Sequence, residues 1–283
     1  MAEQLILRHK NYTATIRTLG AELLSLTKDG QEYIWEGNPA FWKGHAPILF
    51  PICGGLKEDT YCYEGNSYSL AKHGFARFYT FQIEKAADDS ATFLLTSSAE
   101  QIRAYPFPYA LRAIFTLCDE GLSVQYLVTN TGKKPMYYSI GGHEGYACPG
   151  GIEKYSLVFD KEEDMVCHAL DGNLLSYETY SVGQGKELPL KYDYFATDAL
   201  TFLYLRSRKI TLKHANTGEK LTVDFEGFPY VFVWTRPGAD FICIEPWCGI
   251  PDFTDSNFDL ATKKGICTLL PGKERLHTHK ILL

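Results

Sequence analysis

The feature that most constrains the fold is a succession of short segments rich in β-branched and aromatic residues, separated by turn residues. Segments of this kind are typical of strands joined by short links. The predicted strands cover residues 12–17, 22–27, 78–85, 92–97, 111–119, 122–130, 136–141, 156–159, 200–205, 210–214, 220–225, 230–235, 241–246 and 266–270. Helical periodicity is scarce, and one short helix is expected over residues 99–104. The chain is therefore predicted to be all-β, a large antiparallel β-sandwich rather than a doubly wound α/β sheet.

Length and composition are compatible with one large core. The chain has 283 residues, of which 45% are hydrophobic and 14% aromatic. Length alone allows one or two domains, but β-sandwiches often reach this size as a single unit. Because no composition break marks a linker, we expect a single domain over residues 1–283. The least strand-like portion, residues 171–197, is expected to be a long excursion over the surface.

Charge and cysteine usage narrow the functional classes. The net charge is −6 and no basic run occurs, which argues against a nucleic-acid partner and an anionic membrane surface. Neither a signal-peptide pattern nor a long apolar window is evident, so a cytoplasmic location is expected. The eight cysteines form no Cys-x-x-Cys pair and are expected to be mostly buried and reduced. Whether the protein is a monomer or a homodimer is left open.

Two apolar segments end in residues suited to acid/base chemistry. The run that begins at Phe241 reaches Glu245, and Pro246 follows at once, so this strand is expected to stop there. Trp247 lies beside the carboxylate, and aromatic surroundings raise the pKa of a carboxyl group toward that of a general base. The segment 136–141 similarly leads into His143. The two residues are candidates for an acid/base pair, with ordinary rim residues as the alternative.

The segment Lys72-His-Gly-Phe-Ala-Arg77 is a third candidate cluster. His73 and Arg77 can both donate hydrogen bonds from a short loop, and a planar guanidinium suits a carboxylate, a phosphate or a pair of hydroxyls. Gly74 would allow the backbone to approach a ligand closely. The alternative is an ordinary turn with a surface arginine. No nucleotide-binding or metal-ligand spacing is present, so neither a metal nor another cofactor is expected.

Short motifs spread over nearly the whole chain resemble one family. They are Leu19-Gly-Ala-Glu-Leu-Leu-Ser25, Pro47-Ile-Leu-Phe-Pro51, His73-Gly-Phe-Ala-Arg77, Gly142-His143 and Glu245-Pro246-Trp247. In their order and spacing they resemble the aldose 1-epimerases, or mutarotases, of the galactose mutarotase-like superfamily, and in particular the LacX-type branch. The resemblance implies a β-supersandwich that interconverts the α and β anomers of an aldohexose without a metal or organic cofactor.

The resemblance also implies roles for individual residues. His143 matches the general acid that protonates the sugar ring oxygen, and Glu245 matches the general base that takes the proton of the anomeric hydroxyl. His73 matches a histidine that binds and polarises sugar oxygens. Asp198 matches a substrate-binding aspartate more loosely, and Trp247 is expected to contact substrate.

Arg77 belongs to a pattern shared with the hexose-6-phosphate 1-epimerases. In that branch a second arginine before the Pro-x-x-Phe-Pro motif helps to hold phosphate, whereas Lys43 stands at the corresponding position here. A lysine is a point charge rather than a fork, so the expected partner is a free monosaccharide, with a sugar phosphate as the alternative. A non-catalytic carbohydrate-binding protein and another acid/base enzyme acting on a glycan also remain open.

Overall fold

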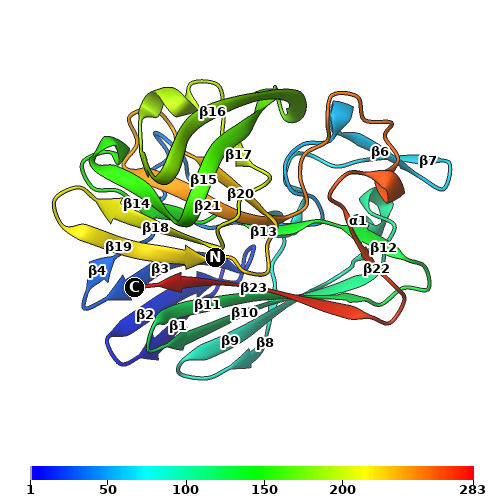
Figure 1. Cartoon of the computed structure of the whole chain (residues 1–283). Coiled ribbons are helices and arrows are strands. Elements are labelled where there is room, and N and C mark those ends of the chain that lie inside the picture. Colours follow the sequence, from blue (N-terminus) through cyan, green and yellow to red (C-terminus); the bar gives the residue numbers. More distant parts are fainter. Residues whose placement is uncertain (1) are drawn as a thin grey trace.

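Two antiparallel sheets packed face to face dominate the computed structural model, which describes residues 2–283 (Figure 1). The larger sheet has nine strands in the order β16-β15-β18-β19-β23-β11-β10-β9-β8. The smaller has six, in the order β17-β20-β21-β13-β5, with β14 also paired to β21. This arrangement confirms the predicted large antiparallel β-sandwich.

The strands have the following bounds. The larger sheet contains β8 (Gln82–Ala86), β9 (Ser90–Thr96), β10 (Tyr109–Cys118), β11 (Gly121–Asn130), β15 (Tyr155–Asp171), β16 (Leu174–Pro189), β18 (Lys209–His214), β19 (Gly218–Asp224) and β23 (Glu274–Leu282). The smaller contains β5 (Ile48–Leu49), β13 (Ile140–Gly142), β14 (Gly145–Ala147), β17 (Leu200–Phe202), β20 (Tyr230–Trp234) and β21 (Phe241–Cys248). A further sheet contains β1 (Gln4–His9), β2 (Tyr12–Arg17), β3 (Glu22–Lys28) and β4 (Gln31–Glu32), and two ribbons pair β6 (Thr60–Tyr63) with β7 (Asn66–Ser69) and β12 (Met136–Tyr138) with β22 (Cys267–Leu269).

Helices are short. They are α1 (Ala99–Ala104) and the 3₁₀ turns η1 (Lys57–Asp59), η2 (Ala76–Phe78), η3 (Ile152–Lys154), η4 (Tyr192–Phe195) and η5 (Leu260–Thr262). The bounds of α1 match the sequence prediction, and the helix starts at a capping box formed by Ser98 and Gln101. The segment Asn216-Thr-Gly218, whose residues are typical of turns, connects β18 and β19 in a hairpin.

The main core lies between the two large sheets, because every second side chain of their strands is apolar and points toward the other sheet. Ile242 and Ile244 of β21 are buried in the same apolar cluster as Leu111 of β10 and Val124 of β11. Side chains of successive strand residues point to opposite faces. Phe241, Cys243, Glu245 and Trp247 of β21 therefore face away from this core, and Glu245 and Trp247 line the candidate site.

Residues 171–197 differ from the expected surface excursion. Most of them form β16, which pairs with β15 in a long hairpin that curls over the smaller sheet (Figure 1). The pairing contains several register shifts, and these let the hairpin bend. As an edge strand, β16 packs on one side only and carries many exposed polar residues together with Gly183 and Gly185, so the apolar alternation that marks other strands is missing.

Strand β21 does not stop at Glu245, so that prediction is wrong. It continues through Pro246 to Cys248. Proline lacks an N–H for the ladder and is tolerated where pairing is interrupted. Such an interruption occurs here, because β21 pairs with β13 at Gly141 and with β14 at Gly145, and Gly142 and His143 between them have no pairing partner on β21.

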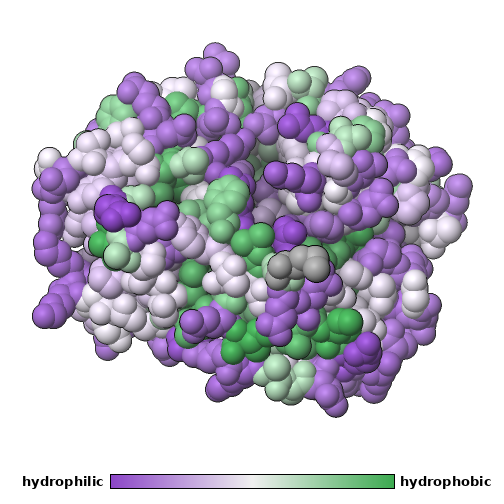
Figure 2. Space-filling model, turned by 180° about the vertical axis from the view of Figure 1, so that it is seen from behind, coloured by the Kyte–Doolittle hydropathy of each residue, from purple (hydrophilic) through white to green (hydrophobic). Residues whose placement is uncertain are grey.

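The surface has a mixed character. Hydrophilic residues predominate on the face opposite that of Figure 1 and are interrupted by small apolar patches (Figure 2). Among residues 2–283, no helix is both long and apolar enough to cross a membrane. The eight cysteines are free, and five of them are buried.

Candidate active site

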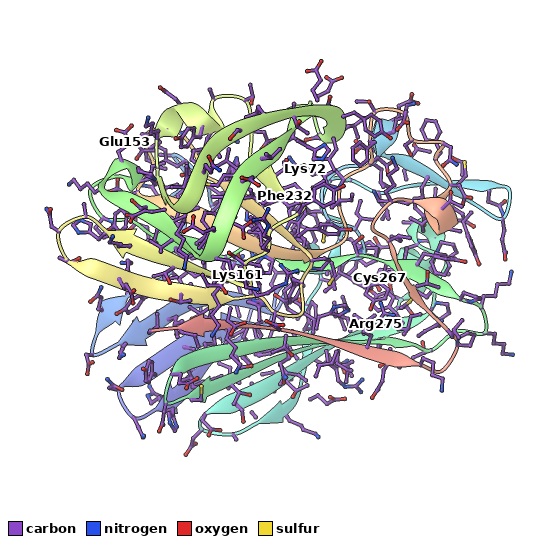
Figure 3. All side chains as sticks on the ribbon, viewed as in Figure 1. Lys72, Glu153, Lys161, Phe232, Cys267 and Arg275 are labelled. Carbon is purple, nitrogen blue, oxygen red and sulfur yellow. The ribbon has the colours of Figure 1, made fainter. Side chains whose placement is uncertain are left out.

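A cavity of about 530 Å³ opens on the face of β20 and β21 that points away from the main core. Lys72 and Phe232 are two of its lining residues, and both are labelled below the β15–β16 hairpin in Figure 3. The residues predicted from the sequence that line it are His73, Arg77, His143, Asp198, Glu245 and Trp247. The cavity thus collects side chains from segments that are far apart in the sequence.

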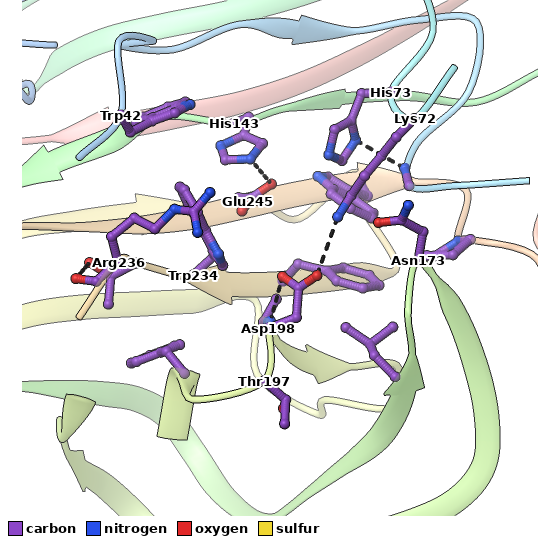
Figure 4. Close-up of a pocket in the computed structure, with 18 of the residues that line it drawn as sticks. Trp42, Lys72, His73, His143, Asn173, Thr197, Asp198, Trp234, Arg236 and Glu245 are labelled. Atoms are coloured by element: carbon purple, nitrogen blue, oxygen red, sulfur yellow. Dashed lines mark hydrogen bonds and ion pairs between the residues drawn. The ribbon is translucent and has the colours of Figure 1, made fainter. Parts of the chain in front are cut away.

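His143 and Glu245 meet on the cavity floor. Nε2 of His143 lies 3.4 Å from Oε2 of Glu245, and both residues are buried (Figure 4). Glu245 is held in the middle of β21, paired with Phe232 of β20. His143 lies in the interruption between β13 and β14, directly opposite on the neighbouring chain segment. Among residues 2–283, Oε2 of Glu245 has no hydrogen-bond partner and neither does Nδ1 of His143.

Burial pushes both groups toward their neutral forms. It raises the pKa of Glu245 well above its ordinary value, although the nearby Lys72 lowers it in part. Burial also lowers the pKa of His143 to about 3. At a separation of 3.4 Å the protonation states of Glu245 and His143 depend on each other, and the two groups titrate as a pair. The pair therefore holds one transferable proton and one free acceptor.

Aromatic rings surround this pair. The Trp42 and His143 rings lie 5.0 Å apart at 31°, and the Trp234 ring meets His143 edge-on at 5.7 Å. On the other side Trp247 stacks on Phe232 with ring centroids 3.9 Å apart. These flat surfaces exclude water from the charged groups and offer apolar faces to a ligand.

His73 has a defined tautomer. The backbone N–H of Gly54 donates to its Nδ1 at 3.1 Å, so Nδ1 is the unprotonated nitrogen. Burial and the neighbouring His143 lower the pKa of His73 well below its ordinary value. The neutral ring therefore carries its proton on Nε2 and acts as a hydrogen-bond donor. Gly74 is not among the described residues that line the cavity, and its backbone lies close to the Phe50 carbonyl.

Charged side chains form the rim. Nζ of Lys72 pairs with Asp198 at 3.3 Å, across the cavity from the acid/base pair (Figure 4). Arg77 lies on η2 and donates from Nη2 to the Lys72 carbonyl at 2.8 Å, while its Nε has no partner within residues 2–283. Arg236 adds a third cation and lies over the Trp234 ring.

Lys43 is placed differently from the other predicted site residues. Its side chain is exposed, and it is not among the described residues that line the cavity. Its neighbour Trp42 occupies the cavity wall instead. The structure thus does not bring Lys43 together with Arg77 in one clamp.

Several lining residues were not foreseen from the sequence, namely Asn173, Phe232, Trp234 and Arg236. Val233 of β20 points into the core, so its neighbours Phe232 and Trp234 point to the opposite face. The two-residue period of a strand could therefore have indicated that Phe232 and Trp234 lie on the same face. Asn173 comes from the tip of the β15–β16 hairpin, which the sequence did not reveal. Behind the site, a buried pair joins Glu144 to Nε2 of His279 at 2.9 Å.

Comparisons with known proteins agree with this geometry. The sequence profile of the family described as Aldose 1-epimerase matches residues 3–281. Protein LacX (plasmid) of Lactococcus lactis subsp. lactis is 34% identical over 281 residues, which cover 94% of each chain. The chain belongs to the aldose 1-epimerase family.

Solved structures support the same assignment for this aldose 1-epimerase family member. A galactose mutarotase related enzyme from Lactobacillus acidophilus has a TM-score of 0.92 at 31% identity, covering 99% of this chain and 97% of that one. A galactose mutarotase-like protein from Lactobacillus casei ATCC 334 has a TM-score of 0.93 at 30% identity, covering 99% of both chains. The family is one of sugar isomerases, so the cavity is a candidate sugar site.

Proposed function

We propose that this protein is a cofactor-independent aldose 1-epimerase that interconverts the α and β anomers of a free aldohexose. The observation that carries the proposal is the 3.4 Å approach of His143 and Glu245 on the floor of a cavity of about 530 Å³. Small-ligand sites span about 300–1,000 Å³, and a monosaccharide fits this range. Family membership supports the reaction class.

The chemistry follows from the single proton of the pair. In the form with Glu245 ionised and His143 protonated, Glu245 removes the proton of the anomeric hydroxyl while His143 donates its proton to the ring oxygen. The C1–O5 bond breaks, and the open-chain aldehyde forms. Rotation about C1–C2 and closure with both proton transfers reversed give the other anomer. The protein ends in its starting state, and each well-placed group contributes about 10²–10⁴-fold.

The remaining residues have supporting roles in this proposal. His73 donates from Nε2 to a sugar oxygen and polarises it, and Asp198 accepts hydrogen bonds from sugar hydroxyls. Trp247 provides an apolar surface for the ring. Arg77 binds oxygens distant from the anomeric centre. All four line the cavity that holds the acid/base pair.

A sugar 6-phosphate is the second candidate substrate because Arg77 and Arg236 both line the cavity. The exposed position of Lys43 weighs against a phosphate clamp built from Arg77 and Lys43. If a phosphate is bound, Arg77→Ala raises KM strongly for the phosphorylated sugar and less for the free one, and added salt weakens binding. If a free aldose is bound, the variant impairs its turnover directly and a phosphate confers no advantage.

The test is anomer-resolved NMR exchange with glucose, galactose and their 6-phosphates, for the wild type and Arg77→Ala. We expect the wild type to accelerate exchange of a free aldose, and to do so equally after exhaustive treatment with EDTA. A preference for the phosphates that disappears in Arg77→Ala contradicts the free-sugar proposal. Binding of a sugar without faster exchange indicates a non-catalytic carbohydrate-binding protein.

A further inference from the structure

Cys243 adds a third potential ligand to the His143–Glu245 pair. One ligand atom from each of the three residues lies within 4.8 Å of the others, and all three are buried. Cys243 and Glu245 occur two residues apart on β21, so their side chains share the face opposite the main core. His143 precedes β14, whose Gly145 pairs with Cys243, and the pairing brings the imidazole alongside.

We propose that His143, Cys243 and Glu245 form a binding site for a thiophilic divalent cation, Zn²⁺ or Cd²⁺, and that the cation inhibits the enzyme by occupying the acid/base pair. The cation is an inhibitor in this proposal and not a cofactor. Inhibition rests on the proposed function, whereas metal binding itself does not.

The distances fit this chemistry. Zn²⁺ is bound by histidine nitrogen and carboxylate oxygen at about 2.0–2.2 Å and by thiolate sulfur at about 2.3 Å. In a tetrahedron these lengths separate a nitrogen and an oxygen ligand by about 3.3 Å. The observed separation between His143 Nε2 and Glu245 Oε2 is 3.4 Å. In the same tetrahedron the sulfur lies about 3.6 Å from the nitrogen and oxygen ligands. The Cys243 sulfur is within 4.8 Å of both, so each distance has to shorten by about 1.2 Å at most.

The ligand types select the class of metal. A set of one sulfur, one nitrogen and one oxygen suits Zn²⁺ and softer ions, whereas Mg²⁺ and Ca²⁺ prefer oxygen ligands. His143 and Glu245 line the cavity, so the fourth corner faces open space that a water molecule or a sugar oxygen can fill. An ionised Cys243 and an ionised Glu245 together balance the charge of a divalent cation.

The unmet hydrogen-bonding capacity of the site is a second, independent observation. Oε2 of Glu245 has no partner among residues 2–283, although the residue is 2% exposed. Binding of a cation releases two protons to solvent, the thiol proton of Cys243 and the proton held by the His143–Glu245 pair, so that all three ligands bind in their unprotonated forms.

The direct test is a crystal of the full chain soaked in Zn²⁺, with anomalous diffraction at the zinc edge. We expect a peak within bonding distance of His143 Nε2, Cys243 Sγ and a Glu245 carboxylate oxygen. The peak should be lost in both Cys243→Ala and Cys243→Ser, the serine variant keeping the shape of the side chain. A wild-type crystal without this peak, or with zinc only at other cysteines, overturns the proposal.

The functional test compares Zn²⁺ inhibition of anomer exchange. In the wild type we expect inhibition that EDTA reverses. Cys243→Ala should retain the metal-free rate while its inhibition constant rises at least about tenfold, the size of effect produced by losing even an outer hydrogen-bond partner of a metal ligand. Cys167→Ala, which removes a buried thiol from β15, is the matched control and should remain sensitive. Equal inhibition of Cys243→Ala and wild type contradicts the metal-site proposal. An absence of turnover with every aldose instead refutes the proposed function, and the diffraction test of metal binding still applies.

Discussion

At the scale of single residues, the surroundings of each group set its chemistry. The same burial that lowers the pKa of His143 to about 3 raises that of Glu245. The raised pKa of Glu245 was expected from the neighbouring Trp247. The lowered pKa of His143 could not be read from the sequence, because Trp42 and Trp234, which bury its ring, reach the site from other segments. The two residues themselves could be predicted, because each interrupts an apolar run with a group suited to proton transfer.

The two histidines are expected to respond differently to substitution. His143→Asn removes the proton donor and should lower kcat by about 10²-fold or more. His73→Asn should mainly raise KM, because the neutral His73 ring binds and orients sugar oxygens. Steady-state kinetics of anomer exchange separates the two effects. If His73→Asn lowers only kcat and His143→Asn raises only KM, the assigned roles are reversed.

At the scale of elements, the apolar pattern that marks a strand could be predicted from the sequence, whereas an interruption in the pairing between strands could not. The strand that carries Glu245 was found from its apolar run, but its continuation through Pro246 depends on the gap in pairing between β13 and β14. That gap is created by long-range pairing, which no local pattern encodes. For a similar reason β16 was missed, since an edge strand with one neighbour needs few apolar residues.

The loop that carries His73 is held by close contact with Phe50, the residue that follows β5. Gly74 has a φ of +65°, and a Cβ built there lies 2.4 Å from the Phe50 carbonyl oxygen. Gly65, at the turn between β6 and β7, has a φ of +78° and no atom within 4 Å of such a Cβ, so it is a matched control. Alanine at either position costs about 1–2 kcal/mol of stability from the left-handed backbone.

Gly74→Ala should cost about 1–3 kcal/mol more than Gly65→Ala, because a backbone carbonyl cannot move aside. It should also raise KM by displacing His73. Denaturant unfolding and sugar titration of both variants measure these effects. Equal loss of stability in Gly74→Ala and Gly65→Ala contradicts this view of the loop.

At the scale of the whole molecule, the large sheet and the main core support a site on the outer face of the smaller sheet. The fold class could be predicted, because strand period and turn residues occur throughout the chain. The composition of the site could be predicted only in part. Asn173 reaches the cavity from the tip of the β15–β16 hairpin, and Arg236 from the link between β20 and β21. Neither residue belongs to a recognisable motif.

The buried His277 makes the stability of the folded protein depend on pH. Its Nε2 lies 2.9 Å from the Tyr138 hydroxyl, and burial lowers its pKa to about 4. In the unfolded chain a histidine has a pKa of about 6.5. The stability due to neutral His277 is therefore fully present above pH ~6.5 and is lost as the pH falls toward ~4, by about 3 kcal/mol.

The measurement is the free energy of unfolding of wild type and His277→Gln as a function of pH. The wild-type value should decrease more steeply than that of the variant between pH ~6.5 and ~4, the window between the unfolded and folded pKa values. Parallel curves for the two proteins contradict a protonation cost at His277.

The central claim is that Glu245 and His143 catalyse anomer interconversion, and Glu245→Gln tests it most directly. Glutamine keeps the size of the side chain but cannot accept the proton of the anomeric hydroxyl. Anomer-resolved NMR exchange with a free aldose should show acceleration by the wild type and a loss of about 10²-fold or more in the variant. Circular dichroism and thermal unfolding should show that Glu245→Gln remains folded. Exchange at nearly the wild-type rate in a folded Glu245→Gln protein would contradict the account.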